Sequence, residues 1–122
     1  MPRDFRALLQ DMLSHSRECQ GYATGKTYLA FSNEPRLRRS IERTLQIVGE
    51  ALTQAVATDP GLLLSISSAQ KIIGLRHRLV HAYHDISEPI LWAVVQDYLP
   101  VLNQELRNLL LENSSDTIEE ES

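Results

Sequence analysis

The amino-acid sequence predicts an all-α fold, an antiparallel four-helix bundle, from three observations. Apolar side chains recur every three or four residues along most of the chain, which is the spacing of a helix that buries one face. No segment shows the alternation of apolar and polar residues that is typical of a half-buried strand. Turn-forming prolines and glycines fall at a few points and leave long helical segments between them.

The chain begins with a helix and a loop. Apolar residues at helical spacing predict the first helix over residues 4–19, with Asp4 as its N-cap and Gly21 at its end. Residues 21–33 mix glycine, threonine and aromatic residues. We therefore expect a loop there, with one helical turn near residues 28–31.

Two long helices follow in the middle of the chain. Residues 33–35 (N-E-P) are a helix-start signal with the asparagine as N-cap, and the helical period then continues to the turn residues at 58–61. Residues 62–67 read as an apolar connector. Ser67 or Ser68 is expected to cap the third long helix.

A fourth helix completes the predicted bundle. Residues 87–89 (S-E-P) repeat the start signal, and Pro100 inside the helix is expected to kink it because proline removes a backbone donor. Residues 113–122 are polar and acidic, which predicts a disordered tail. We expect the chain to divide into a helical domain, residues 1–112, and this acidic tail, residues 113–122.

Charge is distributed unevenly along the chain. The formal net charge is −4, but five of the 16 acidic residues lie in the last eleven positions. Residues 1–111 therefore carry eleven acids against twelve Lys and Arg, and Arg36, Arg38, Arg39 and Arg43 cluster within eight positions. Such a patch suits nucleic-acid binding, and a solvated helix face is an equally good interpretation.

Cysteine usage and hydropathy bear on the compartment. A single cysteine, Cys19, excludes an internal disulfide and is typical of a reducing compartment. The longest apolar runs are too short to span a bilayer, and the N-terminus lacks the apolar region of a signal peptide. We expect a cytoplasmic protein that does not contact a membrane. Cys19 and Trp92 are expected to be core residues.

The stretch from Gly74 to Asp85 concentrates the residues capable of chemistry. It contains Arg76, His77, Arg78, His81, Tyr83 and His84. Cationic groups bind phosphates, and imidazoles transfer protons near neutral pH. On an ideal helix Arg76 and Tyr83 share a face roughly 140–160° away from His81. Either the helix is irregular near His81, or a second copy of the chain completes the site, and we favour a symmetric dimer along this helix.

Four interpretations of this stretch compete. The groups could cleave RNA without a metal, with imidazole as acid or base and guanidinium against the phosphate. His77 and His81, or His81 and His84, could bind zinc, but no Glu or Cys stands at a ligating offset in this helix, so we expect neither metal nor cofactor. The face could bind an anionic ligand without catalysis. Finally, these could be ordinary solvated helix residues.

Four short motifs make the chain resemble a known family. Arg76-x4-His81-x-Tyr83 looks like the R-x4-H-x-Y signature of the HepT-like (DUF86) branch of the HEPN superfamily. Residues 47–51 (I-V-G-E-A) are similar to that family's I-x-G-E-A, residues 72–76 (I-I-G-L-R) to the run before its motif, and residues 97–100 (D-Y-L-P) to its D-x-L-P. The resemblance covers about residues 4–111 in order.

This resemblance implies a function and a partner. It implies a HEPN-like helical-bundle ribonuclease toxin that forms a homodimer along the motif helix. It also implies a cognate MNT-type nucleotidyltransferase antitoxin, which silences the toxin by transferring AMP to Tyr83. By position, Arg76 and His81 would be the catalytic pair. Two departures from the family pattern are Ser68-Ala69 in place of an aromatic helix start, and His84 in place of an apolar residue after the tyrosine.

The resulting hypothesis is a metal-independent endoribonuclease toxin of a type II toxin–antitoxin pair, acting on tRNA or mRNA. We expect six residues to support the site or bind RNA: His77, Arg78, Lys71, Arg36, Arg39 and Arg43. The alternative hypothesis is a non-catalytic helical adaptor, a substrate-binding partner of a nucleotidyltransferase.

Overall fold

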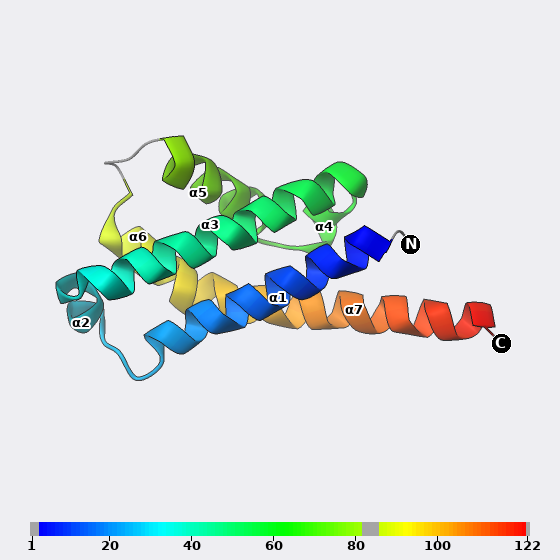
Figure 1. Cartoon of the computed structure of the whole chain (residues 1–122), viewed down its shortest axis with the longest axis horizontal. Helices are drawn as coiled ribbons and strands as arrows, with labels where there is room; N and C mark the ends of the chain where they lie inside the picture. Colours follow the sequence, from blue (N-terminus) through cyan, green and yellow to red (C-terminus); the bar gives the residue numbers. More distant parts are fainter. Residues whose placement is uncertain (1–2, 82–85, 122) are drawn as a thin grey trace.

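The described part of the chain consists of helices and short connections without a strand, which confirms the all-α prediction. The computed structural model describes the backbone of residues 3–81 and 86–121 and the side chains of residues 5–81 and 86–112. Its elements are α1 (Arg3–Ala23), α2 (Tyr28–Asn33), α3 (Pro35–Thr58), α4 (Leu62–Ser65), α5 (Ala69–His81), α6 (Glu88–Ala93), the π-helical turn η1 (Val94–Tyr98) and α7 (Leu99–Glu121). The long segments α1, α3, α5 and α6–α7 alternate in direction along the chain (Figure 1).

The helices pack around one apolar core. α1 lies against α3 on one side and α7 on the other, and α3 carries α5 on its outer side (Figure 1). The largest fully buried side chains come from α1, α2, α3, the α4 region, α6 and α7: Phe31, Leu9, Met12, Ile41, Leu45, Leu52, Leu62, Ile66, Leu91, Leu99, Leu102 and Leu106. Burial of this apolar surface is the main force that assembles the helices.

Three predicted boundaries were wrong. α1 begins at Arg3, so Asp4 lies inside the helix and not at its N-cap. Asn33 is the last residue of α2 and does not cap α3, whose N-cap position is taken by Glu34 without a side-chain hydrogen bond. The reason is that the Thr27 side chain caps α2, accepting from the backbone N–H of Ala30 at 3.1 Å, so the expected single turn extends to six residues. α1 likewise continues past Gly21 and ends at Ala23, just before Gly25 adopts a positive φ of 75°.

Two other boundaries agree with the sequence. Ser87 caps α6, and its side chain accepts from the backbone N–H of Ile90 at 3.3 Å. The connector at residues 62–67 contains the short helix α4 and is followed by α5 at Ala69.

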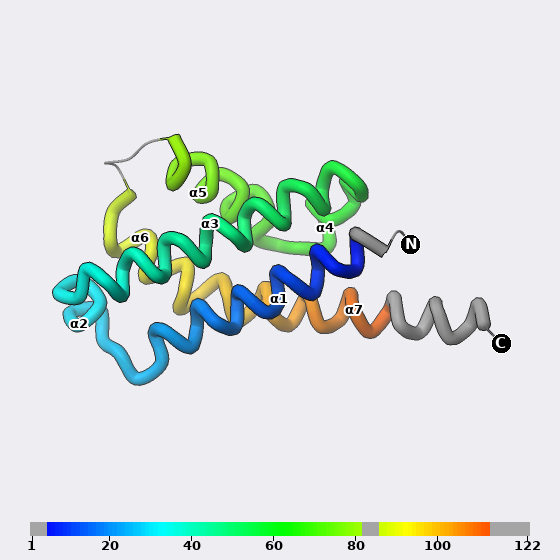
Figure 2. The backbone as a smooth tube through the Cα atoms, in the orientation of Figure 1, coloured from blue at the N-terminus to red at the C-terminus, as the bar shows by residue number. Residues whose placement is uncertain are grey.

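The irregularity expected at Pro100 takes the form of a π-helical turn. The N–H of Leu99 donates to the carbonyl of Val94, five residues earlier, just before the proline that lacks an N–H. The chain changes direction between α6 and α7 at this point (Figure 2). The backbone of α7 stays helical to Glu121 and shows no boundary at residue 112. The division of the chain at that residue therefore remains a prediction from composition. Within the described residues, none of the helices has the length and apolar content needed to cross a bilayer.

Candidate functional site

The helix that carries the motif is seated closely on α3. Ala69, Ile72 and Leu75 bury one side of α5 in the core. At the point of closest approach, a Cβ added to Gly49 would stand 2.3 Å from the Cβ of Arg76, much less than any real contact distance. Glycine is therefore required at position 49, and the G-E pair of the I-V-G-E-A run marks the place where α5 meets α3.

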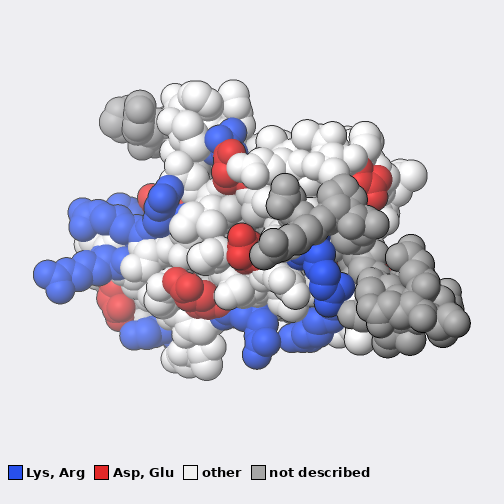
Figure 3. Space-filling view, turned by 45° about the vertical axis from the view of Figure 1, so that its right-hand side comes forward, with Lys and Arg blue, Asp and Glu red and all other residues white. Residues whose placement is uncertain are grey.

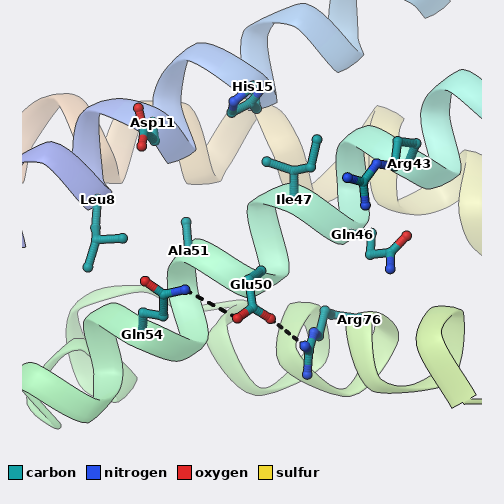
Figure 4. Close-up of a pocket in the computed structure, with 10 residues that line it drawn as sticks. All are labelled: Leu8, Asp11, His15, Arg43, Gln46, Ile47, Glu50, Ala51, Gln54 and Arg76. Atoms are coloured by element: carbon teal, nitrogen blue, oxygen red, sulfur yellow. Dashed lines mark hydrogen bonds and ion pairs between the residues drawn. The ribbon is translucent and has the colours of Figure 1, made fainter.

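Arg76 is held by the residue next to this glycine. Its Nη2 forms an ion pair with Oε2 of Glu50, and Gln54 donates to the other carboxylate oxygen at 3.2 Å (Figure 4). The Arg76 side chain is 27% exposed and that of Glu50 is 44% exposed. The Nε of Arg76 is buried and has no hydrogen-bond partner among the described residues. The guanidinium is thus oriented toward α3 by a charge pair at the edge of the core.

Arg76 and Glu50 line a cleft between α1, α3 and α5. Its volume is about 410 Å³. His15 and Asp11 of α1 and Arg43 of α3 also face it (Figure 4). The cleft therefore brings Arg43, one member of the basic cluster on α3, to the same place as the motif arginine.

The other arginines of that cluster lie elsewhere. Arg36 and Arg39 are exposed near the start of α3. Figure 3 shows basic side chains gathered at the end of the molecule where α2 and α3 meet. This patch and the Arg76 cleft are both compatible with an anionic polymer, and they are separate features of α3.

The motif histidines lie on a different side of α5 from Arg76. His77 and His81 are exposed, and their ring centroids are 4.6 Å apart at an interplanar angle of 49°. Because Arg76 is directed at Glu50, one chain does not bring its guanidinium and the His81 imidazole together. Tyr83 and His84 lie outside the described residues.

Two other expected RNA contacts lie on α5. The Nζ of Lys71 donates to the hydroxyl of Tyr98 at 2.6 Å and lies 4.7 Å from the centre of that ring. Lys71 and Arg78 line one groove between α5 and α6–η1.

Cys19 and Trp92 have structural roles. Cys19 is buried, and burial, with a smaller contribution from the charge of Glu18, raises the pKa of its thiol to about 12. The thiol therefore stays protonated at neutral pH and is a poor nucleophile. The Trp92 ring is partly buried against the core and stacks on Phe31, with the ring centroids 5.1 Å apart. No group of three or more His, Cys, Asp or Glu in the described residues is arranged to hold a metal ion.

Sequence reasoning missed two residues of this region. Glu50 lies within the recognised I-V-G-E-A run. The available signal was a charged residue inside an otherwise apolar stretch of the helix. His15 is the histidine outside the motif, and nothing in its local sequence predicts that α1 places it in the Arg76 cleft.

Comparison with known proteins gives consistent results. A protein of Methanocaldococcus jannaschii whose name gives RNase as an inferred activity is 28% identical over 104 residues, covering 85% of this chain and 94% of its own. A second M. jannaschii protein with the same kind of name is 22% identical over 108 residues, covering 88% and 92%. A similarly named protein of Caldanaerobacter subterraneus subsp. tengcongensis is 27% identical over 86 residues, covering 70% and 76%. No solved structure matches significantly.

The family profile described as ribonuclease HepT-like matches residues 12–109. This range includes the second half of α1, all of α3 and α5, and most of the residues that line the cleft around Arg76. The chain therefore belongs to the ribonuclease HepT-like family.

Proposed function

We propose that the protein is a metal-independent endoribonuclease, the toxin of a HepT/MNT toxin–antitoxin pair in the cytoplasm, with tRNA or mRNA as substrate. The observation that carries the proposal is the family membership combined with an R-x4-H motif on α5 whose imidazole is exposed. The names of the three relatives, which give RNase as an inferred activity, support the same reaction class.

The proposed chemistry uses His81 and Arg76. An imidazole takes the proton of the ribose 2′-hydroxyl, and the resulting oxygen attacks the adjacent phosphorus. The guanidinium stabilises the negative charge that builds on the phosphoryl oxygens. The bond to the 5′-oxygen breaks as that oxygen receives a proton from an imidazolium. The products are a 2′,3′-cyclic phosphate and a 5′-hydroxyl, and no metal or cofactor enters the step.

The arrangement of the two groups supports a site built from two chains. Within one chain Arg76 faces α3 and Glu50, whereas His81 is exposed beside His77. We propose that two copies meet along α5, so that a guanidinium of one copy and an imidazole of the other reach the same phosphate. His77, Lys71, Arg78 and the basic patch on α3 would hold the rest of the RNA.

Control by the partner acts on the motif tyrosine. In this proposal a nucleotidyltransferase antitoxin transfers AMP from ATP to Tyr83, two residues after His81, and releases pyrophosphate. The added phosphate brings negative charge and bulk to the place that the RNA phosphate must occupy. The intact mass of the protein produced together with this partner should then rise by one or more AMP units that map to Tyr83.

The decisive test is cleavage of RNA in EDTA. Wild-type protein should cut RNA and leave a 2′,3′-cyclic phosphate, and His81→Ala should be slower by roughly 10²- to 10⁴-fold, the usual contribution of a general acid or base. Arg107→Gln, which removes an exposed charge on α7, serves as the control and should cut at the wild-type rate. Equal rates for wild type and His81→Ala, or activity that EDTA abolishes, would contradict the mechanism.

A second candidate is the non-catalytic adaptor that presents nucleic acid to a nucleotidyltransferase. The observation in its favour is the ion pair that directs Arg76 toward Glu50 and away from His81. The same assay separates the two functions, because the adaptor binds RNA and leaves it intact.

A further inference from the structure

A groove runs between α5 and the α6–η1 segment. Its volume is about 400 Å³, within the range of small-ligand sites. Apolar side chains form much of its lining: Leu75, Ile90, Ala93 and Val94. Ile90 is 44% exposed, although it is a large apolar residue. An exposed apolar surface in a hollow of this size suits a flat apolar ligand group.

Among the described residues, the polar side chains that line the groove are cationic or neutral. Lys71 and Arg78 are the charged ones in this part of the chain, and Gln70 and Tyr98 are neutral. The Arg76 cleft differs, because Asp11 and Glu50 offset its cations. Of the two hollows, the α5–α6 groove therefore has the stronger attraction for an anion.

One wall of the groove is already ordered. The hydroxyl and ring of Tyr98, in the π-helical turn, hold the ammonium of Lys71. A lysine that is oriented in this way loses less conformational freedom when it meets a phosphate than a free lysine does.

The groove also adjoins the motif imidazole. Gly74, Arg78 and His81 occupy positions i, i+4 and i+7 of α5 and so lie along one face of that helix. A polymer that enters the groove at Gly74 can therefore continue past Arg78 toward His81.

From these features we propose that the α5–α6 groove binds a nucleotide of single-stranded RNA next to the cleaved bond. The base rests on the apolar floor at Ile90, and Lys71 and Arg78 contact the flanking phosphates. The inference rests on the proposed ribonuclease function. It identifies the α5–α6 groove as the place where RNA binds beside the proposed cleavage site. Charge complementarity and an apolar floor, the combination that binds single-stranded nucleic acid, favour this occupant.

Gly74 provides a direct test. A Cβ added there meets no atom within 4 Å, so a larger side chain can extend into the open groove without disturbing α5. Gly74→Leu should fold normally and fill the groove, and Gly74→Ala is its matched control. The probe is a fluorescent 2′-O-methyl RNA oligonucleotide, which cannot undergo attack by the 2′-hydroxyl. Its anisotropy should report binding at least about tenfold weaker for Gly74→Leu and within about twofold for Gly74→Ala, as expected from loss of base contacts.

A second set of variants keeps the groove open. Lys71→Gln and Arg78→Gln should each reduce the slope of log Kd against log salt concentration by about 0.7, the value for one phosphate contact with a single strand. Arg107→Gln should leave both affinity and slope unchanged. If all of these variants bind the oligonucleotide as the wild type does, or if the wild type does not bind it, the groove is not an RNA site.

The outcomes separate this inference from the proposed function. Groove-dependent binding of the oligonucleotide by a protein that does not cut RNA would support the groove and overturn the ribonuclease. Normal cleavage and RNA binding by Gly74→Leu would overturn the groove alone. If Gly74→Leu changes only the mass of the protein in solution, the groove is a protein interface and the inference is wrong.

Discussion

At the scale of single residues, Gly49 has the clearest structural role. It sits where α3 and α5 touch, directly against the Cβ and Cγ of Arg76. Both of these atoms are close to the backbone of α5, so they cannot move aside as the end of a flexible side chain can. The position of Arg76 therefore depends on the absence of a side chain at position 49.

We expect Gly49→Ala to displace α5 and destabilise the protein. Overpacking of this kind costs about 1–3 kcal/mol, which corresponds to a fall in Tm of roughly 4 °C for each kcal/mol in a domain of this size. Thermal unfolding followed by circular dichroism measures the change. The matched control is Gly74→Ala, which replaces a glycine in open space on α5 and should raise stability by up to about 1 kcal/mol. Equal Tm changes in the two variants would mean that the contact with Arg76 does not constrain α5.

At the scale of elements, Glu88 links three helices through its carboxylate. It lies in the first turn of α6, soon after Tyr83 in the chain, and joins α6 to α2 and α3. Ser32 Oγ donates to one of its carboxylate oxygens at 2.5 Å, and Arg38 Nη1 donates to the other at 2.5 Å. The hydrogen bond from Ser32, followed by the hydrogen bond and charge of Arg38, holds the pKa of Glu88 below its usual value.

This lowered pKa predicts a dependence of stability on pH. Because the folded state holds the carboxylate more strongly than the unfolded state, the stabilisation is fully present above about pH 4.3, the ordinary pKa of Glu, and is lost as the pH falls through the lower folded value. The Tm of wild type should exceed that of Glu88→Gln at neutral pH, and the gap should narrow below that pH. A gap that stays constant from pH 7 to pH 3 would show that ionisation of Glu88 does not stabilise the fold.

At the scale of the whole molecule, the separation of Arg76 and His81 on α5 decides how a site can form. Each group has its own surroundings: Arg76 lies in the cleft with α3, and His81 is exposed on another side of the helix. If two copies complete each other, each phosphate contacts Arg76 of one chain and His81 of the other, and a symmetric dimer holds two such sites.

Mixing two inactive variants tests this arrangement. Arg76→Ala and His81→Ala should each be inactive alone, but a mixed dimer regenerates one complete site from the two unaltered residues. With random assortment half of the dimers are mixed and each has one of two sites, so about a quarter of the wild-type rate should return. Co-refolded variants, assayed for RNA cleavage, supply the measurement. If mixing restores no activity although the mass in solution shows mixed dimers, each site lies within one chain.

Much of the fold was predictable from local patterns, and the exceptions have local causes. The Ser87 cap and the main helices could be predicted because their sequence signals, caps and apolar periodicity, involve residues that are close together in the chain. The prediction for Asn33 was wrong because two start signals, at Thr27 and at residues 33–35, lie so close that α2 occupies the space between them. The π-helical turn before Pro100 could be expected as an irregularity, but its form depends on how Leu99 and Val94 pack in the core.

The sequence by itself determined the helical class, the position of the motif on its helix and the family, because periodicity, caps and short motifs are properties of neighbouring residues. Only the tertiary structure decided that Arg76 faces Glu50 across Gly49, that His15 and Arg43 share its cleft, and that Lys71 and Arg78 border an apolar groove. The physical reason is that these contacts join residues far apart in the chain. The helices bring such residues into contact when they pack around the apolar core, and no local sequence pattern specifies which residues will touch.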